Sequence, residues 1–321
     1  MKSAKLILLV TATAMFTGCG QMNDKQVSRK KTSLPEQFIV VLGIAQDAGY
    51  PQAGCEKECC AAYYEGKEEK KSVTCLALVD RKNKQYWLLE ATPDIAAQLK
   101  FLQTYLPVTD YSPDGILITH AHIGHYTGLV QFGREAMGAK DIPVHAMPRM
   151  DSFLRNNGPW SQLVSLNNIW LNRMAADSTF KLSAAFSITP VKVPHRDEYS
   201  ETVGFIIQSE KKKLLFIPDI DKWEKWERDI VAQIKEVDVA LLDGTFYQNG
   251  ELPGRDMREV PHPYVEESLQ KFSALSSKDK SKVVFIHFNH TNPLLKKESD
   301  EKGKVRKEGF AVAEEGMVIE F

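Results

Sequence analysis

Short apolar runs, separated by polar turns that contain glycine or proline, recur from residue 38 to the end of the chain. Runs of about four to eight apolar residues between turn signals predict buried strands. The strands predicted in this way cover residues 38–44, 76–80, 86–90, 114–119, 143–147, 186–193, 203–208, 213–218, 237–242, 283–286 and 316–321. These strands fall into two groups, one in each half of the chain, which favours a fold of two packed sheets.

Helical periodicity separates several of these strands. Apolar residues three or four positions apart predict amphipathic helices. Pro93 suits the first turn of one over residues 93–106, and Trp223 and Trp226 share the apolar face of another over residues 222–235. Further helices are predicted over residues 129–137, 149–156 and 265–272. Strands and helices in this order predict an α/β fold in which two sheets form a sandwich with helices outside.

The beginning of the chain has the pattern of an export signal. Lys2 and Lys5 precede an apolar stretch over residues 6–16, which is too short for an ordinary transmembrane helix, and Cys19 follows small residues. This order resembles a bacterial lipoprotein signal that is cleaved before Cys19, whose thiol is then lipidated. A plain secretory signal is the alternative.

Three segments follow from this interpretation. Residues 1–18 are the signal peptide, residues 19–36 carry the lipidated cysteine and a flexible polar tether, and residues 37–321 form one large domain. The protein is therefore expected to be exported and held in the bacterial cell envelope by a lipid anchor in a membrane. Gly20, directly after the lipidated cysteine, favours the outer membrane.

The charge balance adds little to this picture. The formal net charge is −1, and acidic and basic residues are mixed along the chain, so no electrostatic feature predicts a nucleic acid as partner. The charged runs at residues 65–71 and 296–307 are interpreted as solvated loops or helix faces. A small molecule is the expected substrate.

Candidate metal-binding residues follow the strand predicted over residues 114–119. The segment that begins there contains His120, His122 and His125, with Gly124 before the last histidine. Imidazole is the commonest metal ligand, and alternate residues of an extended loop can converge on one ion. The segment therefore predicts a metal site.

Three more polar residues stand at the ends of predicted strands. His195, Asp219 and His287 each follow an apolar run, and long stretches of sequence separate them. Each alone is weak evidence, because a single histidine after a strand is most often structural. Together, at one edge of a sheet, they could complete the metal site.

These residues, in this order, resemble the ligands of the metallo-β-lactamase superfamily, whose motif is H-x-H-x-D-H. The resemblance extends over residues 38–321 and implies that family's αββα sandwich. It also implies two groups of ligands for one or two metal ions, with zinc as the expected cofactor. By that resemblance His120, His122 and His195 hold the first metal, Asp219 bridges, and His125 with His287 holds the second.

A closer resemblance, to the pyrroloquinoline-quinone biosynthesis protein B group, rests on motifs mostly in the second half of the chain. The matching segments are 91–94 (ATPD), 241–245 (LLDGT), 262–263 (HP), 286–294 (IHFNHTNPL), 309–313 (GFAVA) and 316–317 (GM). Those coenzyme-pathway proteins often lack the first two motif histidines, keep the acid before the last one and are cytoplasmic. The present chain has all three histidines, lacks that acid and carries an export signal.

Gly124 stands where the superfamily motif has its aspartate, so the second metal position lacks one anionic ligand. Three protein ligands and a water still suit zinc. Asp47, in the loop after the first predicted strand, is a candidate to replace the missing carboxylate. The alternative is a turn aspartate that binds its own backbone.

The cysteines form a separate cluster. Cys55, Cys59 and Cys60 are close in sequence, whereas Cys75 begins a predicted strand and is interpreted as a small core residue. Disulfides are the usual state in exported proteins, but three clustered thiols leave one unpaired. Three thiolates and one histidine instead make a closed zinc site. A related phosphodiesterase of phosphonate breakdown has such a structural site, and this similarity assigns the fourth ligand to His290.

These observations predict an enzyme, a metal-dependent hydrolase in which a metal-bound hydroxide attacks an ester, with Asp219 and Asp47 at the metals. His262 is a candidate substrate contact or proton donor, although a loop histidine beside proline is often structural. Family analogy favours a phosphoric ester or diester. The alternatives are a lactone or acyl substrate, an oxygen-using iron enzyme like the coenzyme group, and a non-catalytic binding protein with a decayed site.

Overall fold

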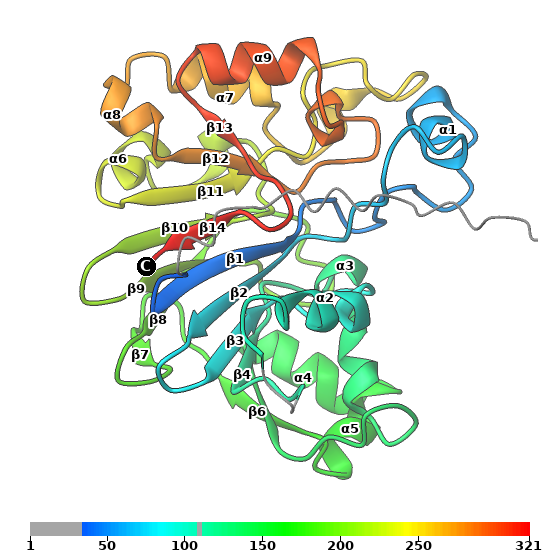
Figure 1. Cartoon of the computed structure of the whole chain (residues 1–321), viewed down its shortest axis with the longest axis vertical. Coiled ribbons are helices and arrows are strands. Elements are labelled where there is room, and N and C mark those ends of the chain that lie inside the picture. Colours follow the sequence, from blue (N-terminus) through cyan, green and yellow to red (C-terminus); the bar gives the residue numbers. More distant parts are fainter. Residues whose placement is uncertain (1–33, 108–110) are drawn as a thin grey trace, which may run out of the picture. The chain divides into compact units, whose positions relative to one another are not determined.

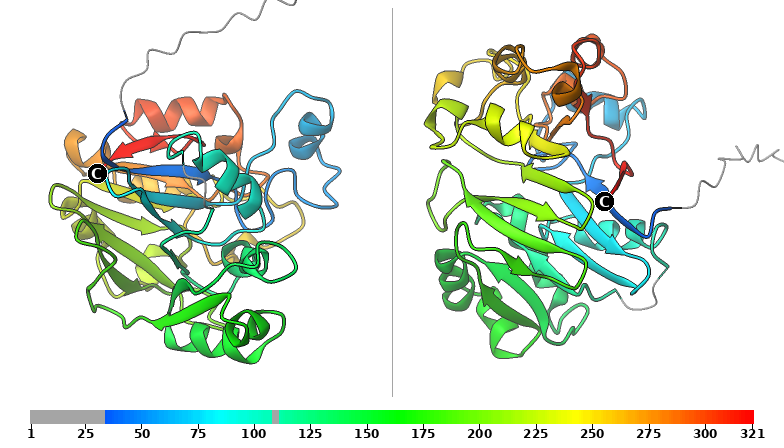
Figure 2. Two further views of the ribbon diagram at one scale, coloured as in Figure 1. Left: turned by 60° about the horizontal axis from the view of Figure 1, so that its bottom comes forward. Right: turned by 90° about the vertical axis from the view of Figure 1, so that its left-hand side faces the viewer.

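The computed structural model describes residues 34–107 and 111–321. The predicted signal peptide, Cys19 and nearly all of the tether lie outside the described residues. Residues 35–321 form one unit, in which two sheets face each other and helices flank them, so the predicted αββα sandwich is confirmed (Figures 1 and 2). Among the helices of the described part, none combines the length and the apolar character needed to cross a membrane.

The first sheet combines the first half of the domain with its last strand. Its order within the described residues is β14-β1-β2-β3-β4-β5-β6. The strands are β1 (Gln37–Gly43), β2 (Cys75–Asp80), β3 (Gln85–Leu89), β4 (Gly115–Leu117), β5 (Ile142–Ala146), β6 (Ile169–Arg173) and β14 (Val318–Glu320). β1 pairs antiparallel with β2 and β14, whereas the pairs from β3 to β6 are parallel.

The second sheet comes from the second half of the chain, in the order β13-β12-β11-β10-β9-β8-β7. Its strands are β7 (Phe180–Lys181), β8 (Ser187–Lys192), β9 (Val203–Gln208), β10 (Lys213–Ile217), β11 (Val239–Asp243), β12 (Val283–Ile286) and β13 (Ala311–Val312). β10, β11 and β12 run parallel to one another. Parallel strands present their carboxyl ends at one edge of a sheet, and ligands of α/β proteins bind there.

Helices cover the outer faces. Near the first sheet lie α2 (Ile95–Leu102), α3 (Ile123–Tyr126), η1 (Thr127–Phe132), α4 (Pro148–Asn156) and α5 (Trp160–Ser165) (Figure 1). Near the second lie η2 (Trp223–Lys225), α6 (Ile230–Lys235), α7 (Val265–Lys271), α8 (Ser277–Lys280) and α9 (Asp300–Lys307). The remaining helices, α1 (Glu58–Tyr64), η3 (Met257–Glu259) and η4 (Pro293–Leu295), belong to connecting segments.

Aromatic side chains join the two sheets. Trp87 of β3 meets Phe186, next to β8, edge-on with ring centroids 5.8 Å apart, and Phe186 also lies 6.2 Å from the ring of Phe321. All three are at most 3 % exposed. Burial of an aromatic side chain contributes roughly 1.5–3 kcal/mol to the free energy of folding, so these contacts stabilise the packing of the two sheets.

Two predicted helices were wrong. The amphipathic segment 222–235 is broken into η2 and α6, because Asp229 is not helical and its side chain caps α6 by accepting from the Val231 N–H. The helix predicted over 129–137 is replaced by the short η1, which ends at Phe132 because Gly133 adopts an extended conformation. The strands β6, β7 and β13 were not predicted.

Candidate metal centre

Strand ends from both sheets bring the predicted ligands together. The histidine motif follows β4, His195 follows β8, Asp219 follows β10 and His287 follows β12. Their ligand atoms fall into two groups that share Asp219, and within each group all of these atoms lie within 4.8 Å of one another. The fold therefore brings together residues that are far apart in the sequence.

The first group consists of His120, His122, His195 and Asp219. The Nε2 atoms of His120 and His195 lie 3.4 and 3.3 Å from the two carboxylate oxygens of Asp219. The His122 Nε2 lies 3.2 Å from Glu198 Oε2, so the nitrogen that this ring turns into the group is Nδ1. These are four ligand atoms, enough for a tetrahedral zinc ion.

The second group consists of Asp47, His125, His287 and the same Asp219. The Asp47 Oδ1 lies 2.8 Å from His125 Nε2 and 3.6 Å from His287 Nε2. Asp219 Oδ2 is 3.5 Å from the first of these nitrogens and 3.7 Å from the second. The structure thus brings Asp47, the candidate replacement for the missing motif acid, to the second group.

The atoms of both groups are buried without ordinary hydrogen-bond partners among the described residues. They are Asp47 Oδ1, His120 Nε2, His122 Nδ1, His125 Nε2, His195 Nε2, Asp219 Oδ1 and His287 Nε2. A buried polar atom that is left unsatisfied costs about 1–3 kcal/mol. Cations held between them would remove that cost, and the residues therefore fit a metal.

In three of these histidines, the Nδ1 atom, which faces away from the proposed metal position, contacts a further side chain. None of these three side chains was predicted as a site residue. Thr119 Oγ1 lies 2.9 Å from His120 Nδ1, and Thr245 Oγ1 lies 2.9 Å from His287 Nδ1. Glu90 Oε1 lies 3.2 Å from His125 Nδ1. Such outer partners fix the tautomer and direct Nε2 toward the metal. Glu90 is a polar residue at the end of an apolar run, but this position in the sequence does not distinguish a supporting residue from a metal ligand.

Backbone strain marks the same place. Glu90 and His287 adopt positive φ angles of 84° and 71°, a region that side chains other than glycine rarely occupy. Each such residue costs on the order of 1–3 kcal/mol and persists only where the surroundings hold it. Of the six non-glycine residues with positive φ in the described part of the chain, these two belong to the metal centre or its immediate support.

Electrostatics favour the metal-binding forms of His120, His195 and Asp219. Burial lowers the pKa of His195 to about 4 and, together with His125, lowers the pKa of His120 well below its ordinary value. Burial alone would raise the pKa of Asp219, but the surrounding imidazoles, His195 first, hold it well below that of a free aspartic acid. Neutral imidazoles and an ionised carboxylate are the forms that bind metals.

His262, the candidate proton donor, lies beside this centre. Its Nδ1 is 2.9 Å from Asp243 Oδ2 and 3.2 Å from Asp219 Oδ1, and the ring is 7 % exposed. Burial by itself would lower the pKa of His262, but Asp243 and then Asp219 raise it. Asp243, missed as a site residue in the sequence analysis, is fixed by N–H donors from Ile220 and Thr245.

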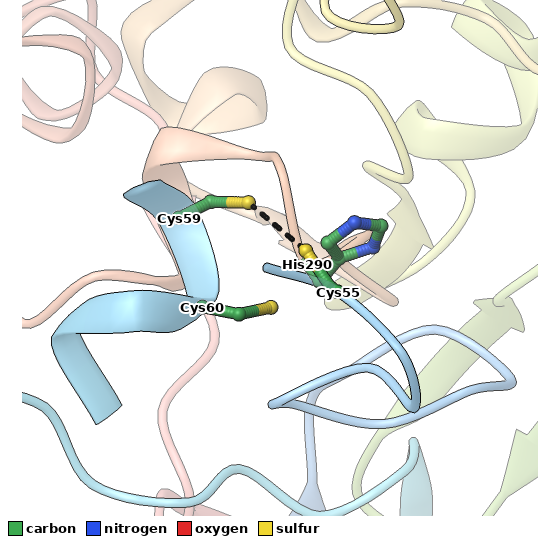
Figure 3. Close-up of side chains that lie close together, drawn as sticks. All are labelled: Cys55, Cys59, Cys60 and His290. Atoms are coloured by element: carbon green, nitrogen blue, oxygen red, sulfur yellow. Dashed lines mark hydrogen bonds between the residues drawn. The ribbon is translucent and has the colours of Figure 1, made fainter. Parts of the chain in front are cut away.

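A separate cluster combines Cys55, Cys59, Cys60 and His290 (Figure 3). The Sγ atoms of Cys55 and Cys59 lie 3.8 Å apart, and all four side chains offer ligand atoms within 4.8 Å of one another. His290 Nδ1 lies 3.1 Å from Asn289 Oδ1, which leaves its Nε2 for the thiols. The described cysteines form no disulfide. This arrangement fits the closed zinc site that the sequence suggested.

The chain is similar to known proteins over most of its length. It is 27 % identical over 308 residues to the coenzyme PQQ synthesis protein B of Pseudomonas putida (strain GB-1), covering 88 % of this chain and 99 % of the relative. The crystal structure of Zn²⁺-bound PqqB from Methylobacterium extorquens superposes with a TM-score of 0.75 at 22 % identity, covering 88 % of this chain and all of that one.

A second solved structure, a diphosphatase from the PhnP family, superposes with a TM-score of 0.60 at 19 % identity, covering 89 % of this chain and 97 % of that one. The sequence model described as the beta-lactamase superfamily domain matches residues 86–288, which span β3 to β12 and every histidine of the two ligand groups around Asp219. The resemblance predicted from the motifs is thereby confirmed, and the chain belongs to the metallo-β-lactamase superfamily.

Proposed function

We propose that this protein is a metal-dependent hydrolase that cleaves a phosphoric ester or diester, with zinc as its cofactor. The observation that carries the proposal is the sharing of Asp219 by two adjacent ligand groups. Pairs of metal ions held side by side are the usual solution for phosphoryl transfer, because they stabilise both the attacking and the leaving oxygen. The similarity to a diphosphatase of the PhnP family agrees with this substrate class.

His120, His122, His195 and Asp219 would hold one ion, and Asp47, His125, His287 and Asp219 the other. When bound there, zinc activates a water and stabilises the charge that develops on the phosphoryl oxygens. The protein supplies the rest. Thr119, Thr245 and Glu90 keep the imidazole rings in the orientation that points Nε2 into the centre.

His262 would serve the departing group. Because two carboxylates engage its Nδ1, the ring nitrogen left for a substrate is Nε2. Asp243 forms a carboxylate–imidazole pair with His262 and holds its ring in place. Asp243 itself accepts a hydrogen bond at Oδ1 from the Thr245 hydroxyl, at 2.7 Å. A positioned histidine that protonates a leaving oxygen typically accelerates a reaction by about 10²–10⁴-fold.

The proposal predicts hydrolysis of bis-p-nitrophenyl phosphate by protein reloaded with zinc after chelation. His262→Asn should lower kcat by roughly 10²-fold or more, the usual contribution of a general acid, with metal content unchanged. His145→Asn is the matched control, since His145 belongs neither to the two ligand groups beside Asp219 nor to the cysteine cluster. Parallel assays use p-nitrophenyl acetate, a lactone and oxygen uptake.

Each alternative function predicts a different result in these assays. Turnover of only the acyl ester or lactone would replace the phosphoric ester as substrate. Stoichiometric iron with oxygen uptake would favour an oxygenase related to coenzyme PQQ synthesis protein B, the relative named above. A protein that binds no metal beside Asp219 and turns over nothing would be a binding protein.

We propose, from the sequence of the first 36 residues, that the enzyme is anchored in the cell envelope through lipidated Cys19. Cys19→Ser should then move the protein from the membrane fraction to the soluble fraction of fractionated cells, because the thiol that carries the lipid is gone. Labelling with a fatty acid should be lost at the same time. Membrane association that survives the substitution would contradict the anchor.

A further inference from the structure

Gly124, at the acidic position of the histidine motif, has no room for a side chain. A Cβ atom there would lie 2.4 Å from Asp47 Cα, 2.6 Å from Asp47 Oδ1 and 3.0 Å from Asp47 Cβ. Contacts under 3.0 Å to backbone atoms require the chain to move. An aspartate at position 124 would therefore not fit unless the segment that carries Asp47 moved.

The carboxylate of Asp47 occupies the space that Gly124 leaves. The side chain is 12 % exposed, and its Oδ1 reaches both histidines of the second ligand group, His125 and His287. This oxygen faces the two imidazole nitrogens at 2.8 and 3.6 Å, and among the described residues no backbone N–H is hydrogen-bonded to it. This weighs against a turn aspartate that binds its own backbone, the alternative raised from the sequence.

Asp47 and the three clustered cysteines share one loop, between β1 and the end of α1. Two backbone hydrogen bonds of 2.8 Å fasten its beginning to the segment after β12, from Gln46 N–H to the Phe288 carbonyl and from Phe288 N–H to the Ile44 carbonyl. Farther along, the Tyr50 hydroxyl donates to the Cys59 carbonyl at 2.8 Å. The beginning of the loop is thus attached to the segment after β12, and Tyr50 links it to the part that carries the cysteines.

The segment after β12 carries the matching ligands. His287 belongs to the second group beside Asp219, and His290 completes the cysteine cluster. The second metal position and the cysteine cluster therefore take their ligands from the same two segments. The first position takes none from the loop, since its ligands follow β4, β8 and β10.

We infer that Asp47 replaces the motif carboxylate as a ligand of the second metal position, so that occupancy of this position depends on zinc in the cysteine cluster. The inference rests on the proposed function, because it assumes a metal beside Asp219. Binding at the cysteine cluster orders the loop that carries Asp47. The affinity of the first metal position does not depend on zinc in the cysteine cluster.

The test is calorimetric titration of Zn²⁺ into metal-free protein, with zinc counted by native mass spectrometry. Asp47→Asn keeps the shape of the side chain and removes its charge. It should weaken the second catalytic position by about 100-fold or more, beyond the usual loss for an outer-shell partner, and leave the first unchanged. Glu56→Gln, an exposed acid on the same loop, is the matched control.

Gly124→Ala adds one methyl group and no ligand, yet it should also weaken the second position by displacing Asp47. Gly124→Asp should do the same. If Gly124→Asp instead strengthened the second position, or if Asp47→Asn left it unchanged, the assignment of Asp47 would be overturned. Circular dichroism spectra identify any variant that does not fold, and Asp47→Asn, which adds no bulk, remains decisive in that case.

Dependence on the cysteine cluster is tested with Cys59→Ser. The second position should lose about 5- to 150-fold in affinity, the usual size of coupling between sites, while the first position keeps its affinity. Equal affinities in wild type and variant would overturn the coupling. Failure of the proposed function is a different result, namely that no zinc binds beside Asp219 in any form of the protein.

Discussion

Asp219→Asn should abolish both catalytic metal positions and lower hydrolysis by far more than about 100-fold, the loss that follows removal of a mere outer-shell partner. The two carboxylate oxygens of Asp219 face five imidazoles, with Nε2 or Nδ1 atoms 3.2–3.7 Å away. The amide keeps the volume but has no negative charge to offset two cations. Zinc per chain and kcat are the measurements.

Asp221→Asn is the matched control, because Asp221 lies two residues further on and pairs with Lys225 at 2.7 Å, away from the ligand groups. It should retain wild-type zinc content and activity. Native zinc content in Asp219→Asn would mean that the histidines alone suffice, and the idea of a shared bridging acid would have to be given up.

Cys59→Ser should release one zinc per chain and lower the melting temperature by on the order of 10 °C. Closed structural zinc sites contribute folding free energy directly, and each kcal/mol lost shifts Tm by about 2–4 °C in a domain of comparable size. Figure 3 shows these four side chains close together, and without the zinc the loop that holds Cys55, Cys59 and Cys60 would lose its attachment to His290. Scanning calorimetry and elemental analysis measure the two effects.

Cys75→Ala provides the comparison. Cys75 is fully buried at the start of β2 and does not belong to the cluster, so its loss should lower stability through packing while the zinc content stays unchanged. A Cys59→Ser variant that kept all of its zinc, or a disulfide among these cysteines in active protein, would contradict a structural zinc site.

The sandwich could be predicted because its strands are short apolar runs with clear turn signals. Segments 76–80, 283–286 and 203–208 coincide with β2, β12 and β9 nearly residue for residue. Helix boundaries were harder. The stripe with Trp223 and Trp226 has helical spacing, but both side chains are buried by tertiary contacts, and Asp229 starts the helix seven residues later than expected.

The metal-binding residues could be proposed because each stands at the end of an apolar run, where a fold of parallel strands gathers side chains. Glu90, Thr119 and Thr245 were missed, since their role is to hold a neighbouring ring and no spacing in the sequence reveals it. The alternatives for Asp47 could not be resolved from sequence either. The fold separates them, because it places Asp47 Oδ1 2.8 Å from His125 Nε2 and 3.6 Å from His287 Nε2.

The most direct test is an anomalous difference map, measured at the zinc absorption edge on crystals of wild-type protein grown with Zn²⁺. We expect three peaks: one enclosed by His120, His122, His195 and Asp219, a second on the other side of Asp219, and a third among Cys55, Cys59, Cys60 and His290. A strong peak at the cysteine cluster with none beside Asp219 would contradict the proposed metal centre.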